Sequence, residues 1–87
     1  MTRKHIFFFY SDNCPKCPPA HKLVDMIEKK INIAVFRFNT NEPVGLAEAS
    51  FNSVMSTPTI IIFNGAKEIK RYTGDMPEYE EIIKVLF

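Results

Sequence analysis

Two cysteines, Cys14 and Cys17, are the only thiols in this 87-residue sequence, and two residues separate them. Only a thiolate attacks a disulfide bond, and an ordinary cysteine, with a pKa of about 8.5, is mostly protonated at neutral pH. A spacing of three positions is close to one helical turn, so the second sulfur could attack a mixed disulfide formed by the first. The pair predicts thiol–disulfide exchange, with Cys14 as the attacking thiol and Cys17 as the resolving thiol.

The surroundings of Cys14 predict that its thiolate is stabilised. The apolar run of residues 5–11 has the length of a strand, and an amphipathic segment follows the cysteines, so Cys14 is expected at a strand-to-helix junction. Unpaired backbone N–H groups and the positive end of the helix dipole would face its sulfur there. Lys16 adds a cation nearby. Together these features predict a pKa below the ordinary value for the Cys14 thiol.

The prolines leave two possibilities for the start of this helix. Pro15 suits a first turn, but Pro18 and Pro19 would interrupt helical hydrogen bonds if the helix began at Cys14. Either the regular helix begins near Cys17 or its first turn is distorted. The apolar stripe is the same in both cases, and it comprises Ala20, Leu23, Val24, Ile27 and Ile31.

Three other uses of the two cysteines compete with exchange chemistry. A structural disulfide would close a loop of only four residues and contribute about 2 kcal/mol, and a reducing cytosol would tend to open it. A zinc site within one chain lacks ligands, because only His21 is nearby. Two chains that share a metal ion or an iron–sulfur cluster through their cysteines would instead form a dimeric carrier or sensor, which is the alternative function. We assign no role to His21 itself, since a solvated helix histidine explains it more simply than a proton shuttle.

Composition bounds the class of protein. With 46% hydrophobic residues, 87 residues suffice for one compact core, so we expect a single domain over residues 1–87. The 11 basic and 10 acidic residues are mixed along the chain, which argues against a nucleic-acid or membrane partner. The apolar runs are far shorter than the roughly 20 residues that span a bilayer, and no signal-peptide pattern is visible. We therefore expect a soluble, monomeric protein of the cytoplasm.

The middle of the chain predicts a strand and a short helix. Residues 33–39 form a second apolar run, which should pair in parallel with the first because a helix connects them. Asn41 and Pro43 are helix start signals. Gly45 weakens this helix, so a turn is the alternative. The phenylalanines of the two strands are expected in the core; they are Phe7, Phe8, Phe9, Phe36 and Phe38.

The C-terminal part predicts a hairpin and a final helix. Two strand patterns, residues 57–63 and 67–73, flank an Asn-Gly pair at 64–65, which is a strong signal for an antiparallel hairpin. The second strand is rich in lysine and suits a sheet edge. A capping pattern that starts at Asp75, with Pro77 in the first turn, then predicts a helix. The apolar face of this helix comprises Tyr79, Ile82, Ile83 and Leu86.

The predicted order is βαβαββα, and three motifs accompany it: YSDNCPKC after the first strand, STPT at the start of the third and YTGD after the fourth. On these motifs the chain resembles the thioredoxin superfamily in its short glutaredoxin-like form, over almost its whole length. The resemblance implies an α/β, thioredoxin-like fold with a central four-stranded mixed sheet flanked by helices. It also implies that Pro58 follows a cis peptide bond beside the cysteines and that Thr57 offers backbone groups to an extended substrate.

The same resemblance implies a set of substrate-binding residues around the dithiol: Lys16, Thr57, Pro58, Gly74 and Asp75. Asp75 matches the acidic residue with which glutaredoxins hold the α-amino group of glutathione, and its capping pattern explains it equally well. Two positions depart from glutaredoxins, because Lys16 replaces a tyrosine and Thr73 replaces the first glycine of a Gly-Gly pair. At Phe8, six residues before Cys14, thioredoxins carry a buried aspartate that this chain lacks.

The cysteine chemistry and the resemblance together predict a dithiol oxidoreductase that reduces protein disulfides. It would bind no cofactor and would carry electrons in a redox-active disulfide between Cys14 and Cys17. Its partners would be disulfide-bearing protein substrates and an external reductant. That reductant is either glutathione or a flavoprotein thioredoxin reductase, and the departures from glutaredoxins favour the reductase.

Overall fold

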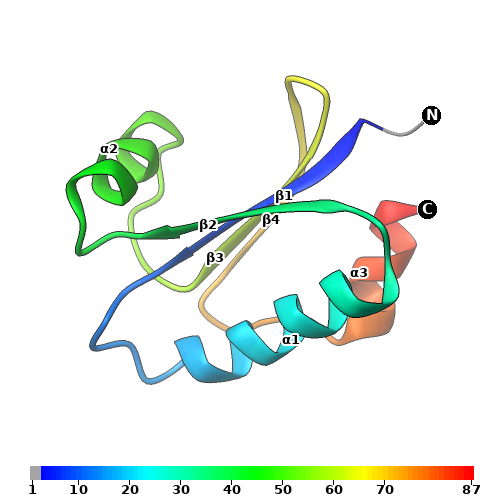
Figure 1. The fold of residues 1–87 in the computed structure, drawn as a ribbon, viewed down its shortest axis with the longest axis horizontal. Helices are drawn as coiled ribbons and strands as arrows, with labels where there is room; N and C mark the ends of the chain where they lie inside the picture. Colours follow the sequence, from blue (N-terminus) through cyan, green and yellow to red (C-terminus); the bar gives the residue numbers. More distant parts are fainter. Residues whose placement is uncertain (1–2) are drawn as a thin grey trace.

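The computed structural model describes residues 3–87 and contains seven elements in the predicted order (Figure 1). The strands are β1 (Lys4–Tyr10), β2 (Ala34–Asn39), β3 (Thr59–Asn64) and β4 (Lys67–Thr73). The helices are α1 (Cys17–Lys30), α2 (Pro43–Phe51) and α3 (Tyr79–Leu86). The order βαβαββα is therefore confirmed for the described residues. None of these helices is both long enough and apolar enough to cross a membrane.

The four strands form one mixed sheet in the order β2-β1-β3-β4. β1 pairs in parallel with β2, with Phe7 opposite Phe36, and it pairs antiparallel with β3. β3 also pairs antiparallel with β4. Because β1 and β3 are central and covered on both faces, their sequences are continuous apolar runs rather than alternating ones. The predicted four-stranded mixed sheet and its parallel first pair are confirmed.

Helices α1 and α3 pack on one face of the sheet and form the larger core (Figure 1). The apolar stripe of α1 points into this core as predicted, except that Ile31 lies just past the helix and is only partly buried. α3 contributes Ile82 and Leu86. The strands contribute Ile6, Phe8, Ile60 and Ile62. This face holds the larger of the two clusters of buried apolar side chains, whose burial drives folding.

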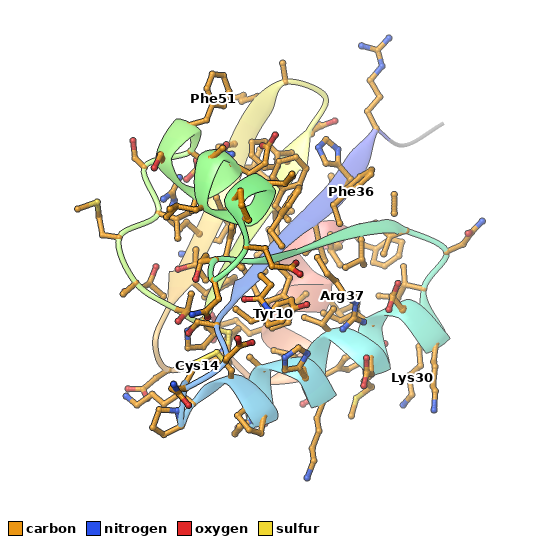
Figure 2. All side chains as sticks on the ribbon, turned by 60° about the vertical axis from the view of Figure 1, so that its left-hand side comes forward. Tyr10, Cys14, Lys30, Phe36, Arg37 and Phe51 are labelled. Atoms are coloured by element: carbon orange, nitrogen blue, oxygen red, sulfur yellow. A yellow bond between two sulfur atoms is a disulfide. The ribbon has the colours of Figure 1, made fainter. Side chains whose placement is uncertain are left out.

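The opposite face is covered by α2 alone, over a smaller core of Phe9, Ala49 and Ile61. Phe36, predicted in the core, is 48% exposed, because β2 is an edge strand and the nine-residue α2 does not cover it fully. Figure 2 shows Phe36 and Arg37 on opposite sides of β2, as alternating strand residues must be. Arg37 points to α1, where it pairs with carboxylates of that helix. The core prediction is wrong for Phe36.

The segment after β2 forms the predicted helix α2 rather than a turn. It begins at Pro43, where the missing N–H removes no helical hydrogen bond. Gly45 is buried against the end of β2, and a Cβ atom at this position would lie 1.9 Å from the carbonyl oxygen of Asn39. The glycine is therefore required by the close approach of α2 to the backbone of β2.

The connection between β3 and β4 is the predicted hairpin. Gly65 has a φ of +64°, the left-handed conformation that an Asn-Gly pair signals. A register shift between Ile62 and Phe63 marks an irregularity in the ladder. The lysine-rich β4 lies at the sheet edge, as predicted.

The last helix starts later than its sequence pattern suggests. α3 begins at Tyr79, and Glu78 before it is extended, with a ψ of 154°. Glu80 and Glu81 in the first turn favour the positive end of the helix dipole. The N-cap position makes no side-chain hydrogen bond, and Asp75 lies outside the helix. The capping interpretation of Asp75 is therefore wrong, because its carboxylate is engaged in an ion pair elsewhere.

Candidate active site

The two cysteines lie between the end of β1 and the first turn of α1, and a disulfide joins their sulfurs (Figure 2). Their Cα atoms are 5.3 Å apart. Cys17 is only 2% exposed, whereas Cys14 is partly exposed and lines a surface pocket. Cys14 is thus the cysteine that a large substrate can reach, which agrees with its predicted role as the attacking thiol.

The regular helix begins at Cys17, which decides between the two possibilities that the prolines left open. Pro18 and Pro19 lie in its first turn, where their missing N–H groups would have no helical acceptor. The N–H of Cys17 donates to the carbonyl of Cys14 at 3.1 Å. Fewer N–H groups are therefore left to face the Cys14 sulfur than the sequence suggested. The helix dipole remains a source of stabilisation for a thiolate at this position.

Lys16 precedes α1, and its cation is paired. Its Nζ donates to Oδ1 of Asp75 at 2.9 Å, although 59 positions separate the two residues in the sequence. This ion pair joins the cysteine loop to the connection between β4 and α3. The hydrogen bond from Lys16, reinforced by its charge, holds the pKa of Asp75 below its usual value. Two of the predicted substrate-binding residues are therefore brought together as partners of each other.

The peptide bond between Thr57 and Pro58 is cis, as the resemblance implied. The N–H of Gly74 donates to the carbonyl of Pro58 at 2.9 Å, which places the YTGD motif beside the STPT motif. The hydroxyls of Ser11 and Thr57 share a hydrogen bond of 2.7 Å, which connects the cysteine loop to the loop before Pro58. Sequence reasoning missed Ser11, because its partner is 46 positions away and leaves no local signal.

Two surface pockets adjoin at Thr57, which lines both of them. One has a volume of about 270 Å³ and is otherwise lined by the cysteine loop: Asn13, Cys14, Pro15 and Lys16. The other has a volume of about 260 Å³ and lies beside α2, with a lining that mixes apolar and polar residues: Thr40, Leu46, Ala49, Val54, Met55 and Ser56. Asn13 is a second residue that sequence reasoning missed. An extended polypeptide could run from Cys14 past Thr57 toward α2.

Residues 4–87 match the Thioredoxin_3 family, whose description is a thioredoxin domain. This chain belongs to the thioredoxin superfamily. The match spans all seven elements and both cysteines, so the superfamily predicted from the three motifs is confirmed. No curated protein matches the sequence.

Solved thioredoxins share the fold at low sequence identity. A mutant thioredoxin from Halobacterium salinarum NRC-1 has a TM-score of 0.83 at 20% identity, over 98% of this chain and 73% of that one. Thioredoxin-2 of a malaria parasite has a TM-score of 0.82 at 20% identity, over 97% and 81% of the two chains. Thioredoxin 1 of Thermosipho africanus has a TM-score of 0.78 at 25% identity, over 92% and 86%. The thioredoxin-like α/β fold is confirmed.

In this thioredoxin-superfamily chain, the interior near the disulfide is apolar. Phe8 is fully buried, and Thr59 is the one polar residue within 3–87 that is buried as a whole. A buried carboxylate that could accept the proton of Cys17 is therefore absent from the described part. His21 packs edge-on against the rings of Phe8 and Tyr10, with centroid distances of 4.9 and 4.7 Å. Its ring is packed and only partly solvated.

The described residues of a single chain offer no metal site. Within residues 3–87, no group of three or more His, Cys, Asp or Glu side chains could hold a metal ion. The sulfurs of Cys14 and Cys17 are bonded to each other in this state, so neither is free to bind a metal. A cluster shared between two reduced chains would need only two ligands from each, and this alternative stays a hypothesis.

Proposed function

We propose that this protein reduces disulfide bonds in other proteins, with Cys14 as the nucleophile and Cys17 as the resolving thiol. The carrying observation is the asymmetry of the disulfide: Cys14 borders a pocket that ends at Thr57, while Cys17 is buried behind it. A substrate disulfide can therefore reach one sulfur only. The buried sulfur is then the intramolecular attacker, which needs no access from outside.

The exchange proceeds in two balanced steps from the reduced protein. The Cys14 thiolate attacks one sulfur of the target disulfide; the target S–S bond breaks, a mixed disulfide forms, and the departing target sulfur takes up a proton. Cys17 then loses its proton and attacks the Cys14 sulfur, which releases the second target thiol. The target gains two electrons and two protons, and the protein is left with the Cys14–Cys17 disulfide found in this structure.

The surface around Thr57 suits an extended substrate segment. Thr57 precedes β3 and lies outside the strand ladder, so its backbone groups could pair with a substrate strand. The pocket beside α2 adjoins the same residue. We propose that the predicted substrate-binding residues contact this substrate segment; they are Lys16, Thr57, Pro58, Gly74 and Asp75.

For the electron donor we propose a flavoprotein thioredoxin reductase rather than glutathione. Glutathione would have to displace Lys16 from Asp75 in order to place its amino group on that carboxylate. A protein donor could instead dock through the surface around Thr57. We further propose that the protein works as a monomer in the cytoplasm and binds no cofactor.

The test measures reduction of a model protein disulfide with either donor system. Cys14→Ser should abolish turnover, and Cys17→Ser should accumulate mixed disulfides that mass spectrometry detects. Ser50→Ala on the exposed surface of α2 is the control and should turn over as the wild type does. Wild-type turnover by the Cys14→Ser protein would contradict the proposal, and cycling with glutathione alone would reject the proposed donor.

A further inference from the structure

The cation nearest to Cys14 in sequence is also the one charged residue that lines its pocket. That pocket is formed by Asn13, Cys14, Pro15, Lys16 and Thr57. An opposite charge within about 4–6 Å stabilises an anion, so a lysine two residues from a thiolate should lower the pKa of that thiol. The benefit depends on where the flexible lysine side chain spends its time.

In this structure Lys16 is directed to a carboxylate. Its Nζ lies 2.9 Å from Oδ1 of Asp75, and the two side chains are 60% and 91% exposed. Asp75 comes from the connection after β4, and its negative charge offsets the charge of Lys16. A cation held in such a pair gives less stabilisation to a neighbouring anion than a free cation does.

The other ionisable groups near Cys14 have partners of their own. Asp12, two residues before Cys14, accepts a hydrogen bond from the side-chain amide of Asn39. His21, on the α1 turn after the cysteines, is packed against Phe8 and Tyr10. Neither lines the pocket of Cys14. Lys16 and Asp75 are therefore the pair whose arrangement can change the charge at this sulfur.

We infer that Asp75 is a positioning residue that pairs with the charge of Lys16 at the pocket of Cys14 and so moderates the reactivity of the Cys14 thiolate. The inference deepens the proposed function, since it rests on Cys14 as the attacking thiol. Asp75 acts through Lys16 and need not touch the substrate. The ion pair thereby makes the dithiol a weaker nucleophilic centre at neutral pH than the lysine alone would make it.

The test is a double-mutant cycle on the fully reduced protein. Four proteins are compared: wild type, Asp75→Asn, Lys16→Gln and the double variant. The midpoint of the pH profile for alkylation of Cys14 by iodoacetamide reports thiolate formation directly. Asp75→Asn should shift the midpoint to lower pH and raise the alkylation rate at pH 6 about twofold, the size expected for an exposed ion pair. Lys16→Gln should shift it to higher pH.

The double variant decides whether Asp75 acts through Lys16. In the Lys16→Gln background, the Asp75→Asn change should have no effect on the midpoint. An equal shift in both backgrounds would mean direct repulsion between Asp75 and the thiolate and would overturn the inference, as would no shift in Asp75→Asn alone. Asp25→Asn, which removes an exposed aspartate paired with Arg37 on α1, is the matched control and should leave the midpoint unchanged.

Salt provides a second readout of the ion pair. Because the side chains of Lys16 and Asp75 are exposed, the difference in alkylation midpoint between wild type and Asp75→Asn should shrink at 0.5 M salt, where the Debye length is ~4 Å. A difference that salt does not reduce would argue against an electrostatic role.

Alkylation needs no turnover, so it tests the ion-pair inference separately from the proposed function. If the midpoints shift as predicted in a protein that reduces no disulfide, the ion-pair inference is supported and the proposed function is rejected.

Discussion

Tyr72 carries the one buried side-chain oxygen in residues 3–87 that has no hydrogen-bond partner of normal geometry. Its ring packs against the larger core from β4. Burial raises the pKa of the Tyr72 hydroxyl, and the negative charge of Glu81, with a weak hydrogen bond to its side chain, adds to this in the same direction. The folded state therefore favours the neutral phenol. The resulting stability is fully present below the ordinary pKa of 10.0 and is lost as the pH rises through the higher folded value.

Replacing Tyr72 with phenylalanine removes this hydroxyl and keeps the packed ring. We expect Tyr72→Phe to leave the free energy of unfolding unchanged at pH 7 or to raise it by up to about 1 kcal/mol, because the hydroxyl has no hydrogen bond of normal geometry to lose. Equilibrium urea unfolding measures the difference, which should widen above pH 10. Tyr79→Phe on α3 is the control for a tyrosine outside the sheet. A clear loss of stability in Tyr72→Phe would show that the hydroxyl has a partner.

Residues of the site differ in how far the sequence could predict them. Cys14 and Cys17 are neighbours in the chain, so their spacing alone indicates the dithiol. The contact between Lys16 and Asp75 spans 59 positions and leaves no periodic pattern. Each of the two also had a sufficient local explanation, one as a cation for the thiolate and the other as a helix cap. Local explanations of this kind hide long-range pairs.

At the scale of elements, α2 shows how tertiary contact can outweigh helix propensity. Glycine is about 1 kcal/mol less favourable than alanine inside a helix, so propensity alone makes Gly45 a weak point. The structure gives it a reason, since a side chain would meet the carbonyl oxygen of Asn39. α2 packs closely on β2 at Gly45 and covers the smaller core. The glycine sets how closely helix and strand can pack.

Gly45→Ala separates these two effects by sign. Propensity predicts that the change stabilises the protein by about 1 kcal/mol, whereas the contact predicts a loss of about 2–4 kcal/mol as α2 is pushed from the sheet. We expect the loss, measured by thermal or urea unfolding. Ser50→Ala, an exposed position in the same helix, should change stability by less than about 0.5 kcal/mol. Stabilisation by Gly45→Ala would mean that α2 can shift without cost.

The helices and strands themselves were predictable because periodicity is a local property. The apolar stripe of α1 and the Asn-Gly hairpin signal at Gly65 both match the structure. The start of α3 was not predictable from its capping pattern, since the ion pair to Lys16 takes the carboxylate of Asp75 instead. Phe36 was placed in the core because strand pattern alone does not reveal that β2 is an edge strand with incomplete cover.

At the scale of the whole molecule, Arg71 connects β4 to the loop after α2. Its guanidinium donates to the carbonyls of Asn52 and Ser53, at 2.8 and 3.2 Å, and to both carboxylate oxygens of Glu68. Ser53 has a φ of +57°, which is uncommon for a residue other than glycine. This loop leads directly to Thr57, so Arg71 supports the surface beside the disulfide from the far edge of the sheet.

Arg71→Lys keeps the charge but cannot make all of these contacts at once. We expect the free energy of unfolding to fall by about 1–2 kcal/mol, because two carbonyls and a paired carboxylate lose a rigid donor. Urea unfolding measures the loss. Arg3→Lys, at an exposed position, is the matched control and should have almost no effect. An unchanged Arg71→Lys protein would show that solvent replaces these hydrogen bonds fully.

The loss of stability in Arg71→Lys should depend on pH. The hydrogen bond from Arg71, together with its charge, holds the pKa of Glu68 below the ordinary value of 4.5. This contribution to stability is present above that ordinary value and is lost as the pH falls through the lower folded value. The difference in the free energy of unfolding between wild type and Arg71→Lys should therefore become smaller at acidic pH.

The start of β1 and the end of α3 lie near each other, at the end of the sheet opposite to the loop that joins β1 to α1 (Figure 1). Nζ of Lys4, at the start of β1, donates to the carbonyl of Leu86 at 2.9 Å. β1 then runs about 20 Å before the cysteine loop begins. A molecule anchored to an electrode or a bead through residues at this end of the sheet would present its sulfurs to the bathing solution. A short peptide that joins the end of α3 to the start of β1 would close the backbone into a ring without touching the chemistry.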